Sequence, residues 1–180
     1  MKLAKNLERL GTETAFSVLA EAKKLEAQGK EMIHLGLGQP DFMTPIHIME
    51  AAKKAIDDGH HGYVLANGIL ECRQAVSRKI KSLYKKDVST DRIIIMPGGK
   101  PTMYFAIQMI GEPGAEIVHP TPGFPIYESM INYTGAKAVP YDLTKEKDLK
   151  FDPEKILSLI TDQTRLVILI NPNNPTGSFV

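Results

Sequence analysis

Apolar residues recur every three or four positions in three stretches of the first half of the chain, which predicts three amphipathic helices. The first is expected at residues 14–28, with Gly29 at its end. The second is expected to begin at Thr44-Pro45, where a hydroxyl can cap the helix and proline suits its first turn, and to close at Gly59. The apolar positions of the three helices are, in order, Val18, Ala22 and Leu25; Ile48, Ala52 and Ile56; and Ile69, Cys72, Val76, Ile80 and Leu83.

Short β-branched runs separated by helical stretches follow Asp87. They predict strands at residues 92–96, 116–119, 137–141 and 166–170, with a helix between each pair. The last run, Leu166–Ile170, is apolar at every position, which is typical of a strand buried on both faces in a parallel sheet covered by helices. The alternation of strands and helices therefore predicts an α/β layered domain.

Three loops that follow predicted strands carry residues able to bind a ligand. Pro97–Lys100 stands at a helix start, where backbone N–H groups and the helix dipole can hold an anion. Pro122–Tyr127 offers an aromatic ring for stacking, and Asn171–Gly177 offers amide donors beyond the carboxyl end of a strand, where ligands of open α/β sheets bind. Each loop can also be read as structural: a glycine turn, a core aromatic or a surface turn. In the last loop, Asn171–Gly177, the paired prolines and asparagines favour a ligand-binding role.

Composition narrows the function classes. The 180 residues carry 22 basic and 21 acidic side chains, a net charge of +1, which argues against nucleic acid or an anionic membrane as a partner. The single cysteine, Cys72, favours a reducing compartment, and His60-His61 lacks metal-ligand spacing, so we expect no metal site. No run is apolar enough to span a membrane and no leader is apparent, which predicts a soluble, cytoplasmic protein.

Five sequence features follow one another along residues 30–180. They are Leu35–Phe42 with Thr44-Pro45; Tyr63 with Gly68, Glu71 and Arg73; Gly98-Gly99-Lys100; Pro120–Tyr127; and Asn171–Gly177. In this order and spacing they resemble the first half of a class I aminotransferase of the aspartate aminotransferase type, a fold-type I pyridoxal-phosphate enzyme. One departure is Cys72, where the family commonly has leucine, a change that a helix core tolerates.

The resemblance implies cofactor-binding roles for five residues. Tyr63 would reach the phosphate of pyridoxal 5′-phosphate across a dimer interface, and Gly99 and Lys100 would lie in the cup that holds this phosphate. Phe124 would stack on the pyridine ring, at a position where many members have tyrosine or tryptophan. Asn174 would donate a hydrogen bond to the phenolic oxygen of the cofactor.

The substrate side of the implied site is only partly present. Gly38 would hold the substrate α-carboxylate through its backbone N–H, and Asn174 counts among the substrate-binding residues as well. By the resemblance, the lysine that forms the Schiff base, the aspartate that pairs with the pyridinium nitrogen and the arginine that clamps the substrate carboxylate lie beyond Val180. We therefore expect this chain to contain no catalytic residue and to be inactive by itself.

The implied fold is the fold-type I large domain, a mostly parallel sheet with helices on both faces, incomplete at its C-terminus. Residues 1–45 would form an N-terminal arm and the first part of the small domain, and residues 46–180 the first half of the large α/β domain. The full-length parent would be a homodimer that transfers an amino group between an L-amino acid, aspartate-like, and a 2-oxo acid by ping-pong chemistry. Two alternatives stay open: a pyridoxal-phosphate lyase or synthase of the same fold, and a non-catalytic phosphate-binding α/β fragment.

Overall fold

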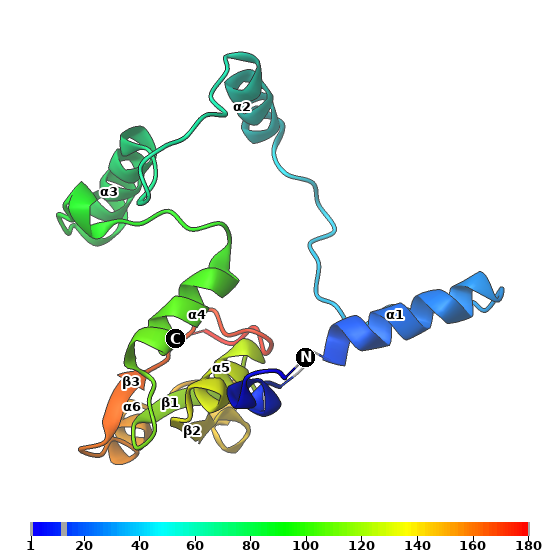
Figure 1. Ribbon diagram of the computed structural model, residues 1–180, viewed down its shortest axis with the longest axis vertical. Helices are drawn as coiled ribbons and strands as arrows, with labels where there is room; N and C mark the ends of the chain where they lie inside the picture. The colour runs from blue at the N-terminus through cyan, green and yellow to red at the C-terminus, as the bar shows by residue number, and fades with distance from the viewer. Residues whose placement is uncertain (1, 12–13, 180) are drawn as a thin grey trace. The chain divides into compact units, whose positions relative to one another are not determined.

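The computed structural model describes residues 2–11 and 14–179 (Figure 1). The chain forms two compact units, one made of Met1–Met32 with Gly98–Val180 and the other of Ile33–Pro97. We call the first the sheet unit and the second the helical unit. The division of the chain into small-domain and large-domain parts at residues 45 and 46 stays a prediction.

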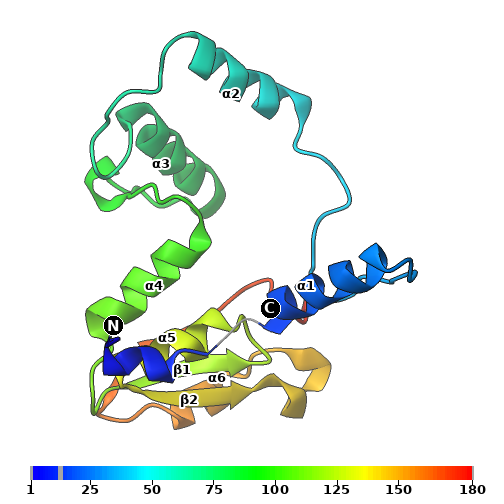
Figure 2. The ribbon, with the colours of Figure 1, turned by 45° about the vertical axis from the view of Figure 1, so that its right-hand side comes forward.

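Three parallel strands form the centre of the sheet unit. They are β1 (Glu116–Thr121), β2 (Lys137–Asp142) and β3 (Thr164–Val167), in the order β2-β1-β3. Figure 2 shows β1 and β2 side by side. Val118 in the middle of β1 stands opposite Val139 on one side and Val167 on the other. This parallel arrangement confirms the α/β architecture expected from the alternation of strands and helices.

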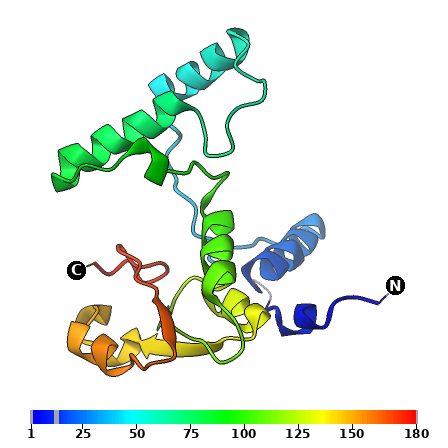
Figure 3. The ribbon, with the colours of Figure 1, turned by 60° about the vertical axis from the view of Figure 1, so that its left-hand side comes forward.

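Helices cover both faces of this sheet. They are α4 (Gly99–Ile110) and α5 (Ile126–Thr134) on one face and α6 (Pro153–Ser158) on the other. The same unit contains α1 (Thr14–Ala27) and the 3₁₀ turns η1 (Lys5–Arg9), η3 (Leu143–Lys145) and η4 (Lys147–Leu149). Successive residues of a strand face opposite sides, so Ile117 packs with Ile107 of α4 and Ile131 of α5, whereas Val118 packs with Ile156 of α6. The helices α4 and α5 lie side by side on their face (Figure 3).

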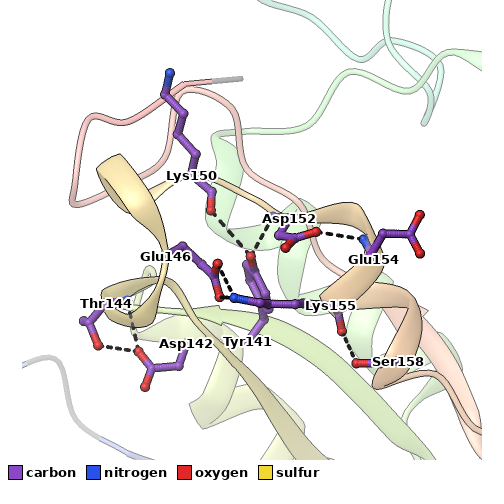
Figure 4. A network of polar contacts seen from close by, with 9 residues as sticks. All are labelled: Tyr141, Asp142, Thr144, Glu146, Lys150, Asp152, Glu154, Lys155 and Ser158. Atoms are coloured by element: carbon purple, nitrogen blue, oxygen red, sulfur yellow. Dashed lines mark hydrogen bonds and ion pairs between the residues drawn. The ribbon is translucent and has the colours of Figure 1, made fainter.

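Hydrogen bonds fix the segment between β2 and α6 (Figure 4). The backbone N–H of Asp152 donates to the Tyr141 hydroxyl at 2.6 Å, and the Lys155 ammonium donates to both carboxylate oxygens of Glu146 at 2.8 and 2.7 Å. The Asp152 side chain accepts from the N–H of Glu154 at 3.0 Å and so caps the start of α6.

The first residues of the chain are tied to α5. The Arg9 guanidinium donates to the carbonyls of Asn132 and Tyr133 at 2.9 and 2.8 Å, which satisfies two carbonyls at the C-terminal end of the helix. The Gly11 N–H donates to the Ser129 hydroxyl at 3.0 Å, and this hydroxyl donates back to the Gly11 carbonyl at 3.2 Å.

The helical unit contains α2 (Ile46–Asp57), α3 (Leu70–Tyr84) and the 3₁₀ turn η2 (Thr90–Arg92). Arg73 of α3 is buried, and its guanidinium donates to the carbonyls of Gly68 at 3.1 Å and Thr90 at 3.0 Å. The hydroxyl of Ser77, one turn further, donates to the Val88 carbonyl at 2.6 Å. These bonds fasten the segment that follows α3 to the helix itself.

The start predicted for α2 is wrong by one residue, and the apolar face predicted for this helix is exposed. Pro45 is the N-cap residue rather than the first helical residue, and no described side chain caps this helix, Thr44 included. The apolar stripe is exposed, with half of Ile48 accessible, because nothing within the described helical unit covers it. The end at Gly59 is confirmed: its φ is 83° and its N–H donates to the Ile56 carbonyl.

Two predictions about strands are also wrong. Residues 93–96 form no strand and Arg92 belongs to η2, because an extended apolar run needs a neighbouring strand and the described residues place none beside it. The doubly buried strand is β1, not β3. Within the described chain β3 pairs with β1 alone, so its residues are half-buried or exposed.

Candidate functional site

Two of the predicted ligand loops meet beyond the carboxyl ends of β1 and β3. The strands are parallel, so the chain leaves both of them at the same edge of the sheet. The Asn173 side-chain amide donates to the Pro122 carbonyl at 3.4 Å and thereby joins the loop after β3 to the loop after β1. The structure therefore brings together segments that are 51 residues apart in the sequence.

The third predicted loop forms the start of α4 in the same unit. Gly98 is the N-cap residue, with φ 96° and ψ 167°, a conformation that side-chain-bearing residues rarely adopt. No described side chain caps the helix, its first turn carries no acidic residue, and a Cβ placed on Gly98 would meet no described atom within 4 Å. The backbone N–H groups of Gly99 and Lys100 lie in this first turn, where the helix dipole favours an anion.

Lys100 connects this helix start to the aromatic loop. Its ammonium group lies 5.5 Å from the centre of the Phe124 ring and 5.1 Å from the centre of the Phe16 ring of α1, within the range of cation–π attraction. The Phe124 ring also meets Tyr127 edge to face, with 6.2 Å between the centres and 84° between the planes. Phe124 is thus held from two sides.

Asn173 is the buried residue of the loop after β3, and backbone hydrogen bonds hold the loop around it. This residue is 3% exposed, its N–H donates to the Ser178 carbonyl, and its carbonyl accepts from the Gly177 N–H, both at 2.8 Å. Asn174, the residue singled out from the sequence, is exposed. Sequence reasoning missed Asn173, although its place beside Asn174 between two prolines marks it as part of the same turn.

Gly38 and Tyr63 lie in the helical unit, whereas the other four predicted residues, Gly99, Lys100, Phe124 and Asn174, lie in the sheet unit. Both Gly38 and Tyr63 are exposed. Tyr63 lines a cavity of about 530 Å³, shared with His60, Val64 and Ile69 of the same unit. The roles that the resemblance implies for Gly38 and Tyr63 stay predictions.

Positive charge at the carboxyl edge comes from Lys100 rather than from histidine. His119 is buried in β1, and this burial lowers the pKa of its imidazole, which is therefore neutral at neutral pH. Within residues 2–11 and 14–179, no three His, Cys, Asp or Glu side chains gather closely enough to hold a metal ion. Nor does any helix of those residues have the length and apolar character needed to cross a membrane.

Comparison with known proteins gives the same assignment as the motifs. The family model for class I and II aminotransferases matches residues 30–180. Aspartate aminotransferase of Bacillus subtilis is 34% identical over 177 residues, which cover 98% of this chain and 45% of that enzyme. A (5-formylfuran-3-yl)methyl phosphate transaminase of Methanocaldococcus jannaschii is 35% identical over 178 residues, which cover 99% of this chain and 46% of that protein.

Solved structures of fold-type I aminotransferases match this chain as well. Alanine aminotransferase of Pyrococcus furiosus superposes with a TM-score of 0.91 at 31% identity, over 99% of this chain and 46% of that one. Aspartate aminotransferase of Thermus thermophilus, solved with maleate, gives a TM-score of 0.91 at 31% identity, over 99% and 47%. The chain spans slightly less than half the length of the relatives it matches. It belongs to the family of class I and class II aminotransferases, and the class I members that it resembles depend on pyridoxal 5′-phosphate.

Proposed function

We propose that the full-length protein transfers an amino group between an L-amino acid and a 2-oxo acid by ping-pong chemistry, with aspartate as the leading donor. The observation that carries this proposal is the meeting of three family motifs at one sheet edge, where Lys100 lies 5.5 Å from Phe124 and Asn173 is bonded to Pro122. The relatives named aspartate aminotransferase support the choice of donor. Because this chain spans about 45% of those relatives, the activity is assigned to the full-length protein.

The sheet unit fits the phosphate of pyridoxal 5′-phosphate at the start of α4. The N–H groups of Gly99 and Lys100 and the Lys100 ammonium would hold it, since this end of the helix has no capping side chain among the described residues and has open space at Gly98. A dianion gains from the helix dipole and from the ammonium charge together. A carboxylate in the first turn would oppose such binding, and α4 has none there.

Phe124 and Asn174 would orient the cofactor ring. The Phe124 ring, in edge-to-face contact with Tyr127, would offer a face for the pyridine, and the exposed Asn174 amide would donate to the phenolic oxygen. When bound, the cofactor supplies the electron-withdrawing ring that stabilises negative charge at the substrate Cα. The part played by this chain is to bind the phosphate, fix the plane of the ring and polarise its oxygen.

Gly38 and Tyr63 complete the proposal from the helical unit. Gly38 binds the substrate α-carboxylate through its N–H, and Tyr63 donates its hydroxyl to the cofactor phosphate of a second subunit in a cytoplasmic homodimer. The full exposure of Tyr63 in one chain supports this role, because a residue that serves a second subunit must be accessible. Sedimentation of the full-length protein tests the dimer, and a monomer at micromolar concentration would remove the role of Tyr63.

The proposed reaction is tested by following the transfer of a ¹⁵N-labelled amino group. The full-length protein, loaded with pyridoxal 5′-phosphate, is mixed with ¹⁵N-aspartate and 2-oxoglutarate. Appearance of ¹⁵N in glutamate is the expected result. Release of ¹⁵N-ammonia instead would favour the lyase alternative, and phosphate binding without any movement of ¹⁵N would favour the non-catalytic fragment. The same assay on the 180-residue polypeptide tests the sequence-based expectation that this chain alone is inactive.

A further inference from the structure

Asn173 begins a directed series of hydrogen bonds that ties three segments together. Its side-chain amide donates one N–H to the Pro122 carbonyl at 3.4 Å and the other to the Thr176 hydroxyl at 2.9 Å. The Ser178 hydroxyl lies 2.7 Å from the Thr176 hydroxyl and donates to the Leu149 carbonyl at 2.7 Å. Because the single Ser178 proton goes to Leu149, the bond between the two hydroxyls has Thr176 as its donor.

All donors in this series point away from Asn173. The order runs from the Asn173 amide through Thr176 and Ser178 to Leu149, so an N–H donor at residue 173 fits its direction. Bonds aligned in this way polarise and strengthen one another. A carboxylate of the same shape would have no proton to donate and would place its oxygens against the Pro122 carbonyl.

The other end of the Asn173 amide does not contribute to stability. Its Oδ1 atom is buried and, among the residues that the structure describes, finds no hydrogen-bond donor. A buried acceptor without a partner destabilises the folded state, because it has given up its hydrogen bonds to water. A leucine of similar size would remove this penalty, but it would also leave the Pro122 carbonyl and the Thr176 hydroxyl without the N–H groups of residue 173.

We propose that Asn173 is the positioning residue of the 171–177 loop: its amide holds this loop on the Pro122 carbonyl, which sets the place of Asn174 relative to Phe124. This inference rests on the proposed function, since it gives Asn174 and Phe124 their cofactor roles. Asn173 itself is too buried to touch the cofactor. It acts through its neighbour, and its removal displaces the ring-binding end of the site while the start of α4 stays intact.

Two ligands test the ring-binding end of the site and the start of α4 separately in the full-length protein. Pyridoxamine 5′-phosphate carries the ring, its phenolic oxygen and the phosphate, whereas inorganic phosphate tests the α4 end alone. For Asn173→Leu and Asn173→Asp we expect affinity for pyridoxamine 5′-phosphate to fall on the order of tenfold, with affinity for inorganic phosphate unchanged. Asn132→Leu on α5 is the matched control and leaves both affinities unchanged. Equal affinities in the variants and the parent, or a parallel loss for both probes with a lower unfolding midpoint, would overturn the proposal.

Hydrogen exchange tests the positioning without any ligand. In the apoprotein the Gly177 N–H, which donates to the Asn173 carbonyl, is expected to exchange faster in Asn173→Leu than in the parent, while the N–H groups of β1 exchange as before. Asn173→Gln keeps the N–H donors, should restore part of the protection, and serves if the leucine variant does not fold. Unchanged exchange at Gly177 refutes the positioning role. Failure of the parent protein to bind pyridoxamine 5′-phosphate refutes the proposed function instead.

Discussion

The ammonium group of Lys100 lies 5.5 Å from the centre of the Phe124 ring, which connects the start of α4 to the loop after β1. A positive charge and an aromatic face are therefore neighbours at the carboxyl edge of the sheet. A ligand with a phosphate at one end and a flat ring at the other matches this pair, and the two residues should affect different parts of its binding.

Phe124→Leu is expected to weaken binding of pyridoxamine 5′-phosphate about tenfold and to leave binding of inorganic phosphate unchanged, because only the ring loses its stacking partner. Fluorescence titration measures the first affinity and competition the second. Phe151→Leu, which removes a ring stacked on Tyr141 at 5.9 Å, is the matched control and should leave both affinities unchanged. Equal weakening for both ligands would contradict the stacking role.

Lys100→Gln should weaken binding of inorganic phosphate about tenfold and make the remaining affinity less sensitive to salt, since one charge at the helix start is lost. Lys23→Gln on α1 removes the same charge elsewhere and serves as the control. Isothermal titration at low and high ionic strength gives both quantities. If phosphate affinity stayed unchanged, Lys100 would have no part in the phosphate cup.

The sequence was a good guide where local pattern decides structure. The apolar spacing around Val76 and Ile80 predicts α3, and Gly59 predicts the end of α2, because both depend on neighbours along the chain. Residues 93–96 show the limit: their apolar character fits a strand, yet a strand needs a partner to satisfy its backbone, and that depends on distant segments.

The site was predictable in its loops but not in its contacts. Glycine, proline and asparagine mark the three loops because these residues suit turns, whatever the fold around them. Turn composition cannot distinguish the buried Asn173 from the exposed Asn174, since burial depends on the loop after β1, far away in sequence. The contact between Lys100 and Phe16 is missed for the same reason, because it joins α1 to α4.

Gly68→Ala should destabilise the helical unit more than Gly59→Ala. Both glycines have positive φ, 94° and 83°, so both substitutions introduce backbone strain. At Gly68 the added Cβ would also lie 2.7 Å from a side-chain carbon of Ile95, whereas at Gly59 it would meet no described atom within 4 Å. We expect a difference of about 1–3 kcal/mol in the free energy of unfolding, measured with urea. Because the Ile95 Cβ would also lie 2.8 Å from the added atom, the further change Ile95→Gly should recover part of this difference, and additive losses would argue against the overlap.

Tyr141→Phe should lower the free energy of unfolding by about 1–2 kcal/mol, because the Asp152 N–H loses the hydroxyl to which it donates at 2.6 Å. The stacking on Phe151 survives this change, so the loss reports on the two hydrogen bonds of the hydroxyl, which accepts from the Asp152 N–H and donates to the Lys150 carbonyl at 3.5 Å. Tyr133→Phe is the control, since no bond to its hydroxyl occurs within the described residues. If both variants lost the same free energy of unfolding, the hydrogen bonds of the Tyr141 hydroxyl would not be the cause of the loss.

The sheet unit should lose stability in acid, because the contribution of the charged Glu116 carboxylate disappears there. The Lys137 ammonium, 2.7 Å away, and the Thr161 hydroxyl, which donates at 2.7 Å, lower the pKa of the Glu116 carboxyl below its ordinary value. A lowered pKa in the folded state means that the charged carboxylate contributes stability above the ordinary value, and that this contribution is lost as pH falls through the folded-state pKa. Glu116→Gln should therefore destabilise the protein more at about pH 7 than at about pH 3. Urea unfolding at both values measures this, with Glu112→Gln, on the exposed turn before β1, as the control. A loss of the same size at both pH values would show that the carboxylate charge is not the cause.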